Sequence, residues 1–141
     1  MESFENIERD LRYINWKIKI KGREILKDFK ITIPQFIALC NIINNEGMPI
    51  GELSKIMALS SSTVTELIDR MERNQLVIRK RDENDKRIYR IYAKEKGKII
   101  RKEVINRRVK YVSELLKKTN IDTYCFSDSL GKLRKTIEER E

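Results

Sequence analysis

Apolar residues in the first thirty positions recur at alternating steps of three and four. They are Phe4, Ile7, Leu11, Ile14, Ile18 and Ile25, with the polar Lys21 in the remaining place of the series. This spacing predicts a long helix with a narrow, heptad-like stripe. Such a stripe either faces the protein's own core or meets a partner helix, so a dimer is expected from this end of the chain.

Helical periodicity returns after Thr32. Thr32 suits an N-cap because Pro34 follows within the first turn. The apolar positions Phe36, Leu39, Cys40 and Ile43 then predict a helix that stops at Asn44, Asn45 and Gly47.

Two shorter helices are predicted next. Pro49 opens the first, whose expected buried face is Ile50, Leu53, Ile56 and Met57. Ser60 is the expected N-cap of the second, whose apolar face is Val64, Leu67, Ile68 and Met71 and which runs to Asn74. Two short helices joined by a tight polar turn form a helix-turn-helix.

The pattern then changes from helix to strand. Residues 76–81 and 86–93 are β-prone, and residues 82–85 are rich in turn formers. Tyr89, Ile91 and Ala93 fall on one face of the second strand. A β-hairpin directly after a helix-turn-helix predicts a winged helix.

Helical periodicity resumes beyond Gly97. It predicts a long helix with apolar positions at Ile99, Ile100, Val104, Ile105, Val109, Val112, Leu115 and Leu116. A last helix is expected over about residues 126–138, with Leu130, Leu133 and Ile137 as its stripe. The fold class is therefore mainly α with a small β-hairpin wing.

Composition agrees with one helical, soluble domain. The 141 residues are 40% hydrophobic and 38% charged, with five Gly and two Pro. No run approaches the roughly 18 apolar residues of a membrane span, and the first ten residues are acidic and polar, unlike a signal peptide. We expect a cytoplasmic protein that does not bind membranes.

The chain has no histidine and two cysteines, Cys40 and Cys125. Without histidine there is no Ser-His or Cys-His nucleophile, and a zinc site would need carboxylates. We therefore expect that the protein is not an enzyme and that it binds no metal and no cofactor. Cys40 is interpreted as a core residue, and Cys125 is expected to be more exposed.

The net charge of +9 is concentrated in one part of the chain. Residues 76–96 hold eight cations against four anions, and residues 97–118 hold eight against two. A localised basic excess is typical of a nucleic-acid binder, because phosphate contacts release counterions. Taken alone, the charge also allows an anionic membrane surface, an acidic protein, or no partner at all.

The sequence resembles the MarR-type winged-helix transcription regulators over nearly its whole length. The resemblance rests on TIPQF, GELSKIMALS, SSTVTELIDRMERNQLVIR, and Asp85-Lys86-Arg87 followed by Glu95-Lys96-Gly97. It implies a homodimeric repressor that binds a near-palindromic double-stranded DNA operator. Residues 31–97 would form the DNA-binding lobe of the single domain 1–141, and residues 1–30 and 98–141 would form the dimerisation helices. A winged-helix module that binds a protein or RNA is the alternative.

The resemblance also implies a set of DNA-binding residues. Arg87 would reach the minor groove from the wing, and Asp85 would shape the turn or orient Arg87. Hydroxyls at the start of the second short helix would approach phosphates and base edges. The full predicted set is Ser60, Ser61, Ser62, Thr63, Thr65, Arg70, Arg79, Lys80, Arg81, Lys86, Arg87 and Arg90. Arg79 would either brace the wing or reach the DNA backbone.

Three features of the sequence depart from the family pattern. Gln75 replaces the usual Gly, so Asn74 is expected to adopt the left-handed conformation instead. Ala93-Lys94 replaces Leu-Thr, which removes a capping hydroxyl before the next helix. Glu66 could accept from a cytosine amino group, cap Thr63 in a T-x-x-E box, or pair with Arg70; the cap is favoured.

Many members of such a family respond to a small-molecule effector. The candidate pocket residues are Tyr13, Trp16, Phe36 and Tyr111, each of which is alternatively a core residue. The absence of histidine argues against zinc sensing, and the first helix has no cysteine for oxidation sensing.

Overall fold

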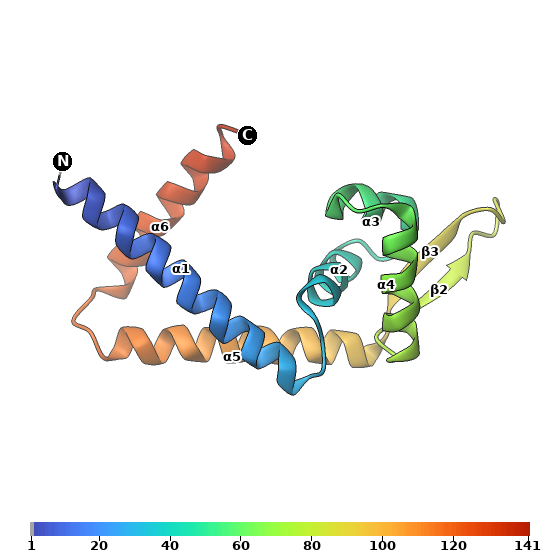
Figure 1. The fold of residues 1–141 in the computed structure, drawn as a ribbon, viewed down its shortest axis with the longest axis horizontal. Helices are drawn as coiled ribbons and strands as arrows, with labels where there is room; N and C mark the ends of the chain where they lie inside the picture. The colour runs from blue at the N-terminus through green and yellow to red at the C-terminus, as the bar shows by residue number, and fades with distance from the viewer. Residues whose placement is uncertain (1) are drawn as a thin grey trace. The chain divides into compact units, whose positions relative to one another are not determined.

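The computed structural model describes the backbone of residues 2–141 and the side chains of residues 3–141. The chain divides into two compact units, the first ending at Arg108 and the second beginning at Val109, and this boundary falls inside helix α5 (Glu95–Lys117). The predicted winged helix-turn-helix is confirmed (Figure 1). The elements are α1 (Glu2–Asp28), α2 (Ile33–Asn44), β1 (Met48–Pro49), α3 (Ile50–Met57), α4 (Ser61–Arg73), β2 (Val77–Arg81), β3 (Tyr89–Ala93), α5 (Glu95–Lys117) and α6 (Thr123–Glu138).

The start of α2 is fixed by a capping box. The backbone N–H of Gln35 donates to Thr32 Oγ1 at 3.3 Å, and the backbone N–H of Thr32 donates to Gln35 Oε1 at 3.0 Å. This reciprocal pair satisfies two N–H groups that a helix start leaves without partners. Thr32 is thus the N-cap that the sequence predicts, with Pro34 in the first turn.

The predicted buried face of α3 is only partly correct. Leu53 is fully buried, whereas Ile56 is 47% exposed. Because α3 is only eight residues long, it contacts α2 and α4 around Leu53, and Ile56 lies at the edge of that face. The helix ends at Ala58, which adopts a left-handed conformation with φ +52°.

The hairpin is the larger part of a three-stranded antiparallel sheet in the order β1-β3-β2. In β3, Ile91 pairs with Met48 of β1 and with Arg79 of β2. Ile91 is therefore central in the sheet, and its side chain is fully buried. The strand β1 was not predicted, because two residues are too short to show a periodic pattern.

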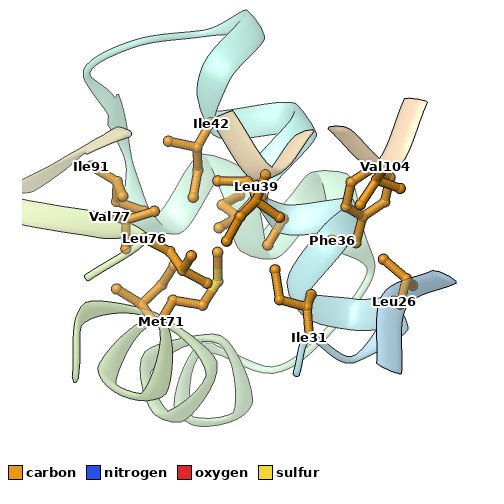
Figure 2. Close-up of a cluster of buried hydrophobic side chains, with 14 of the residues drawn as sticks. Leu26, Ile31, Phe36, Leu39, Ile42, Met71, Leu76, Val77, Ile91 and Val104 are labelled. Atoms are coloured by element: carbon orange, nitrogen blue, oxygen red, sulfur yellow. The ribbon is translucent and has the colours of Figure 1, made fainter. Parts of the chain in front are cut away.

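The core of the first unit joins all of its elements (Figure 2). Leu39 of α2 lies near its centre, with Ile42 of α2 and Met71 of α4 on either side, and Val77 and Ile91 lie where the strands border the cluster. Leu26 of α1 and Val104 of α5 are buried in the same cluster. The end of α1 and the first half of α5 thus stabilise the lobe itself.

Helix α5 begins earlier than predicted, at Glu95 instead of beyond Gly97. Gly97 lies in its first turn, where an added Cβ would stand 2.5 Å from the carbonyl oxygen of Leu76 and 2.9 Å from Leu39 Cδ1. The same Leu76 carbonyl accepts the backbone N–H of Lys94 at 2.9 Å. Only a glycine lets α5 pass this close to the strand that follows α4.

The second unit contains the end of α5 and helix α6. Helix α6 starts at Thr123 instead of residue 126, because Asp122 is its N-cap and accepts from the backbone N–H groups of Tyr124 and Cys125 at 2.9 and 3.0 Å. No residue of α6 is buried. Cys125 is exposed and Cys40 is partly buried, as predicted. Within the described residues, no helix is long and apolar enough to span a bilayer.

Gly97→Ala is expected to destabilise the lobe by about 2 kcal/mol, since the new methyl group collides with backbone and with a core side chain. The denaturant midpoint of unfolding measures the loss. Gly51→Ala in α3 is the matched control, because an added Cβ there meets nothing within 4 Å; it is expected to be neutral or to stabilise by up to about 1 kcal/mol. Equal midpoints for the two variants would contradict the argument.

Candidate nucleic-acid interface

The start of α4 carries a cluster of hydroxyl groups. Ser60 Oγ accepts the backbone N–H of Thr63 at 3.2 Å, so Ser60 is the N-cap, as predicted. The Ser60 hydroxyl also lies 3.2 Å from that of Ser62 and 2.7 Å from that of Thr63. The hydroxyls of Ser61 and Thr65 are exposed on the same turns. A helix start with short polar side chains allows close approach of a phosphate or a base edge.

Glu66 does not cap the helix, contrary to the favoured interpretation. Because Ser60 is the N-cap, Thr63 already lies inside α4 and its N–H is bonded to Ser60. Glu66 instead accepts from Arg70 Nη2 at 2.7 Å, one turn along the exposed face. Arg70, predicted to bind DNA, is therefore paired within its own helix.

The end of α4 corrects a second expectation. Gln75 takes the left-handed conformation with φ +63°, whereas Asn74 has φ −83°. The backbone N–H of Leu76 donates to the carbonyl of Met71 at 3.0 Å, and that of Gln75 donates to the carbonyl of Glu72 at 3.0 Å. This is the Schellman arrangement, which requires a positive φ at the position of Gln75 whatever residue stands there.

Arg79 braces the sheet against α4. Its Nη2 lies 2.7 Å from Asp69 Oδ1 and its Nε lies 3.5 Å from Glu72 Oε2. Its backbone N–H also donates to Glu72 Oε2 at 2.8 Å. Of the two roles considered for Arg79, bracing the wing or reaching DNA, the contacts in the structure are those of a brace.

The turn of the wing is organised by Asp82, a residue that the sequence analysis did not single out. Asp82 Oδ1 accepts the backbone N–H groups of Asn84 and Asp85 at 2.8 and 3.0 Å. An Asp at the start of a four-residue turn is a signal that could have identified it. Its other oxygen, Oδ2, accepts from Arg90 Nε at 2.6 Å.

Arg90 extends this contact to another part of the lobe. Its Nη1 donates to the carbonyl oxygen of Gly47 at 2.9 Å. We call the contacts among Asp82, Arg90 and the Gly47 carbonyl the wing clasp. The Arg90 hydrogen bond, and then the two turn N–H groups, lower the pKa of Asp82 to about 2 from 3.8. The clasp is thus intact above the ordinary Asp range and is lost as the pH falls toward 2.

Arg87 lies at the tip of the wing. Its side chain is 89% exposed, and its Nε and Nη2 donate to the two oxygens of Asp85 at 3.0 and 3.1 Å. Asp85 Oδ1 also accepts the backbone N–H of Arg87 at 3.1 Å. These hydrogen bonds lower the pKa of Asp85 below its usual value. The guanidinium is thus held in one orientation while it faces solvent.

Two further cations lie along the hairpin beside tyrosines. Lys80 Nζ lies 5.2 Å from the centroid of the Tyr92 ring. Arg81 stacks 5.4 Å from the Tyr89 centroid and donates to the Tyr89 hydroxyl at 2.9 Å. Lys86 is exposed in the turn. The structure thus brings Lys80, Arg81, Lys86 and Arg87 together on the hairpin.

The cations in the first part of α5 contact other parts of the protein. Arg101 donates to Asn44 Oδ1 at 2.8 Å, and Arg107 pairs with Asp28 at 2.8 Å. Lys98 lies 3.5 Å from Glu46, and Arg108 stacks 4.9 Å from the Phe36 centroid. These four cations connect α5 to α1, to α2 and to the residues that follow α2.

The residues proposed for an effector pocket do not form one cavity within the first unit. Tyr13 and Trp16 are an exposed edge-to-face pair on α1, with centroids 5.9 Å apart, whereas Phe36 is buried in the core. Tyr111 belongs to the second unit. A separate hollow of about 410 Å³ is lined by Ile18, Lys19, Gly22, Arg23, Leu26, Ile33 and Arg108.

A helix-turn-helix that continues directly into a cationic hairpin defines a winged helix-turn-helix DNA-binding protein. The MarR family model matches residues 31–89. The chain is 41% identical to the uncharacterized HTH-type transcriptional regulator YsmB of Bacillus subtilis, over 99% of this chain and 97% of that protein. It is 32% identical to the HTH-type transcriptional regulator SarZ of Staphylococcus aureus, over 92% of this chain and 85% of that protein.

A solved structure gives the same result. A MarR family protein from Bacillus stearothermophilus is similar to this chain with a TM-score of 0.83 and 40% identity, over 97% of this chain and 96% of the other. The chain belongs to the MarR family and is a DNA-binding transcriptional regulator.

Asp82→Asn tests the wing clasp. The carbonyl oxygen of asparagine can still accept the two turn N–H groups. Its NH₂ group stands where Oδ2 of Asp82 accepted from Arg90 and cannot accept, so only the clasp is lost. Amide hydrogen exchange in residues 82–88 is expected to speed up by about threefold or more, with no change in α4. Asp10→Asn, an equal charge change on exposed α1, is the control; equal exchange in the wing of both variants would refute the role of the clasp.

Proposed function

We propose that the protein is a homodimeric repressor that binds a near-palindromic double-stranded DNA operator and is released by a small-molecule effector. The observation that carries the proposal is that the hydroxyl-rich start of α4 and the exposed guanidinium of Arg87 belong to one rigidly braced lobe. The first suits the major groove and the second suits the narrow minor groove beside it.

Dimerisation is supported by apolar surface that one chain leaves uncovered. Phe4, Ile7, Leu11, Ile14 and Ile18 are exposed along α1, and α6 has no buried residue but exposes Leu130, Leu133 and Ile137. A helix of 16 residues that buries nothing gains little from its own hydrogen bonds in water. A second copy of the chain would cover these stripes and place two lobes for two half-sites.

The DNA contacts that we propose are a subset of those predicted from sequence. Ser61, Ser62 and Thr65 would approach bases and phosphates from α4, and Arg87 would enter the minor groove. Lys80, Arg81 and Lys86 would neutralise phosphates along the hairpin. A MepR variant of S. aureus with this fold (TM-score 0.75, 19% identity) has been solved bound to an oligodeoxyribonucleotide. Arg79 and Arg90 would act within the protein, as brace and clasp.

An effector would bind beside α1 and α2. The hollow is lined by the apolar side chains of Ile18, Leu26 and Ile33 and by the cations Lys19, Arg23 and Arg108. Such a lining suits a small ligand that combines an apolar body with an acidic group. Because the hollow involves both α1 and α2, a ligand there would change how the lobe is held against the dimerisation helix.

Fluorescence anisotropy of the protein with duplex DNA from upstream of its own gene tests the proposal. A preference of about a thousandfold over a shuffled duplex is expected near physiological salt, with two chains per duplex by light scattering and a steep fall of affinity with salt. Equal weak binding to both duplexes would contradict an operator upstream of the protein's own gene, and tighter binding to RNA or to an acidic protein would contradict operator binding altogether.

Arg87→Ala is expected to weaken operator binding by about tenfold to a hundredfold, because the contact to the narrow minor groove is lost. The side chain is exposed, so the melting temperature should not change. Arg9→Ala on α1, whose side chain is 63% exposed beside Asp10, controls for the removal of one positive charge. Operator affinity equal to that of the wild type would remove Arg87 from the interface.

A further inference from the structure

The first two turns of α4 contain no cation. Residues 61–69 read SSTVTELID, so their polar side chains are hydroxyls and two carboxylates. The commonest base-specific contact, an Arg or Lys that donates to guanine O6 and N7, therefore cannot come from this part of the helix. If these turns read bases, the hydroxyls can donate or accept, whereas the carboxylates can only accept.

The carboxylates of α4 differ in where they are held. Asp69 and Glu72 both bind Arg79 and are thereby turned toward the sheet. Glu66 is 65% exposed and is held by Arg70, which lies on the same helix and contacts only Oε1, at 2.7 Å. Among the described residues, nothing donates a hydrogen bond to Glu66 Oε2.

The Glu66–Arg70 pair can approach DNA where a lone carboxylate could not. A bare carboxylate would be repelled by the phosphates on both sides of the groove, whereas the paired Arg70 offsets that charge. The arginine also limits the rotation of the glutamate. Glu66 thus presents one oriented acceptor oxygen in the second turn of α4.

The donors and acceptors that each base presents in the major groove determine which base this oxygen can bind. Guanine and thymine present acceptors, which would repel it. Adenine presents the N6 donor beside its own N7 acceptor, whereas cytosine presents the N4 donor and no acceptor of its own in the groove. We propose that Glu66 is a specificity-determining residue that accepts a hydrogen bond from the exocyclic amino group of a cytosine in each half-site. The inference rests on the proposed docking of α4 in the major groove.

Selection from a random duplex library by wild type, Glu66→Gln and Glu66→Ala tests this assignment. The wild type is expected to select cytosine at one symmetric pair of positions, where another base lowers affinity about tenfold or more. Glu66→Gln is expected to select adenine there, because an amide can accept from N6 and donate to N7. Glu66→Ala is expected to discriminate by less than about twofold at that position.

The control is Glu103→Gln, which makes the same charge change at an exposed position of α5. It is expected to raise affinity for all sequences slightly and to leave the selected motif unchanged. A wild-type motif that is retained at every position in both Glu66 variants would overturn the inference alone. Selection of a base other than cytosine at the position that Glu66→Ala relaxes would overturn the cytosine assignment. A wild type that selects no motif would overturn the proposed function and this inference with it.

Discussion

Three elements meet at the backbone of Leu76, and the DNA-binding lobe depends on this junction. The N–H of Leu76 closes the end of α4 by donating to Met71, and its carbonyl accepts from Lys94 just before α5. Its side chain is buried. The first turn of α5 passes so close to the Leu76 carbonyl that only a glycine fits at position 97. The angle between α4, the hairpin and α5 is therefore set by backbone contacts, which side-chain rearrangement cannot easily change.

Ion pairs between arginines and carboxylates then hold the hairpin in the orientation that this junction gives it. Arg79 joins the start of the hairpin to α4 through Asp69 and Glu72, and the wing clasp joins the turn of the hairpin to the Gly47 carbonyl. A hairpin held at both ends presents its tip with little freedom to lose on binding. Exposed pairs of this kind add little to stability, so their main consequence is the orientation of Arg87 and α4.

The sequence predicted the parts of the fold that have local, repeated signals. Helix periodicity, the Thr32 and Ser60 caps and the hairpin turn were all visible within a few residues. The strand β1 was too short to recognise, and two capping motifs competed at the start of α4, where Ser60 is the N-cap and the T-x-x-E pattern is not used. The clasp joins Arg90 to a carbonyl 43 residues away, and no local pattern contains such a contact.

The same distinction separates cations that the charge pattern treats as one group. Counted along the chain, the cations of the hairpin and of α5 form one basic excess, but the structure divides them by partner. Arg79 and Arg90 bind carboxylates and a carbonyl within the lobe, and Arg101 and Arg107 connect α5 to α2 and α1. Phosphate contacts release counterions from the DNA, and a cation whose charge a carboxylate of the protein already offsets contributes less to that release. In the function that we propose, phosphate neutralisation therefore falls mainly to the hairpin, and sequence-specific recognition falls to the acceptor-rich start of α4.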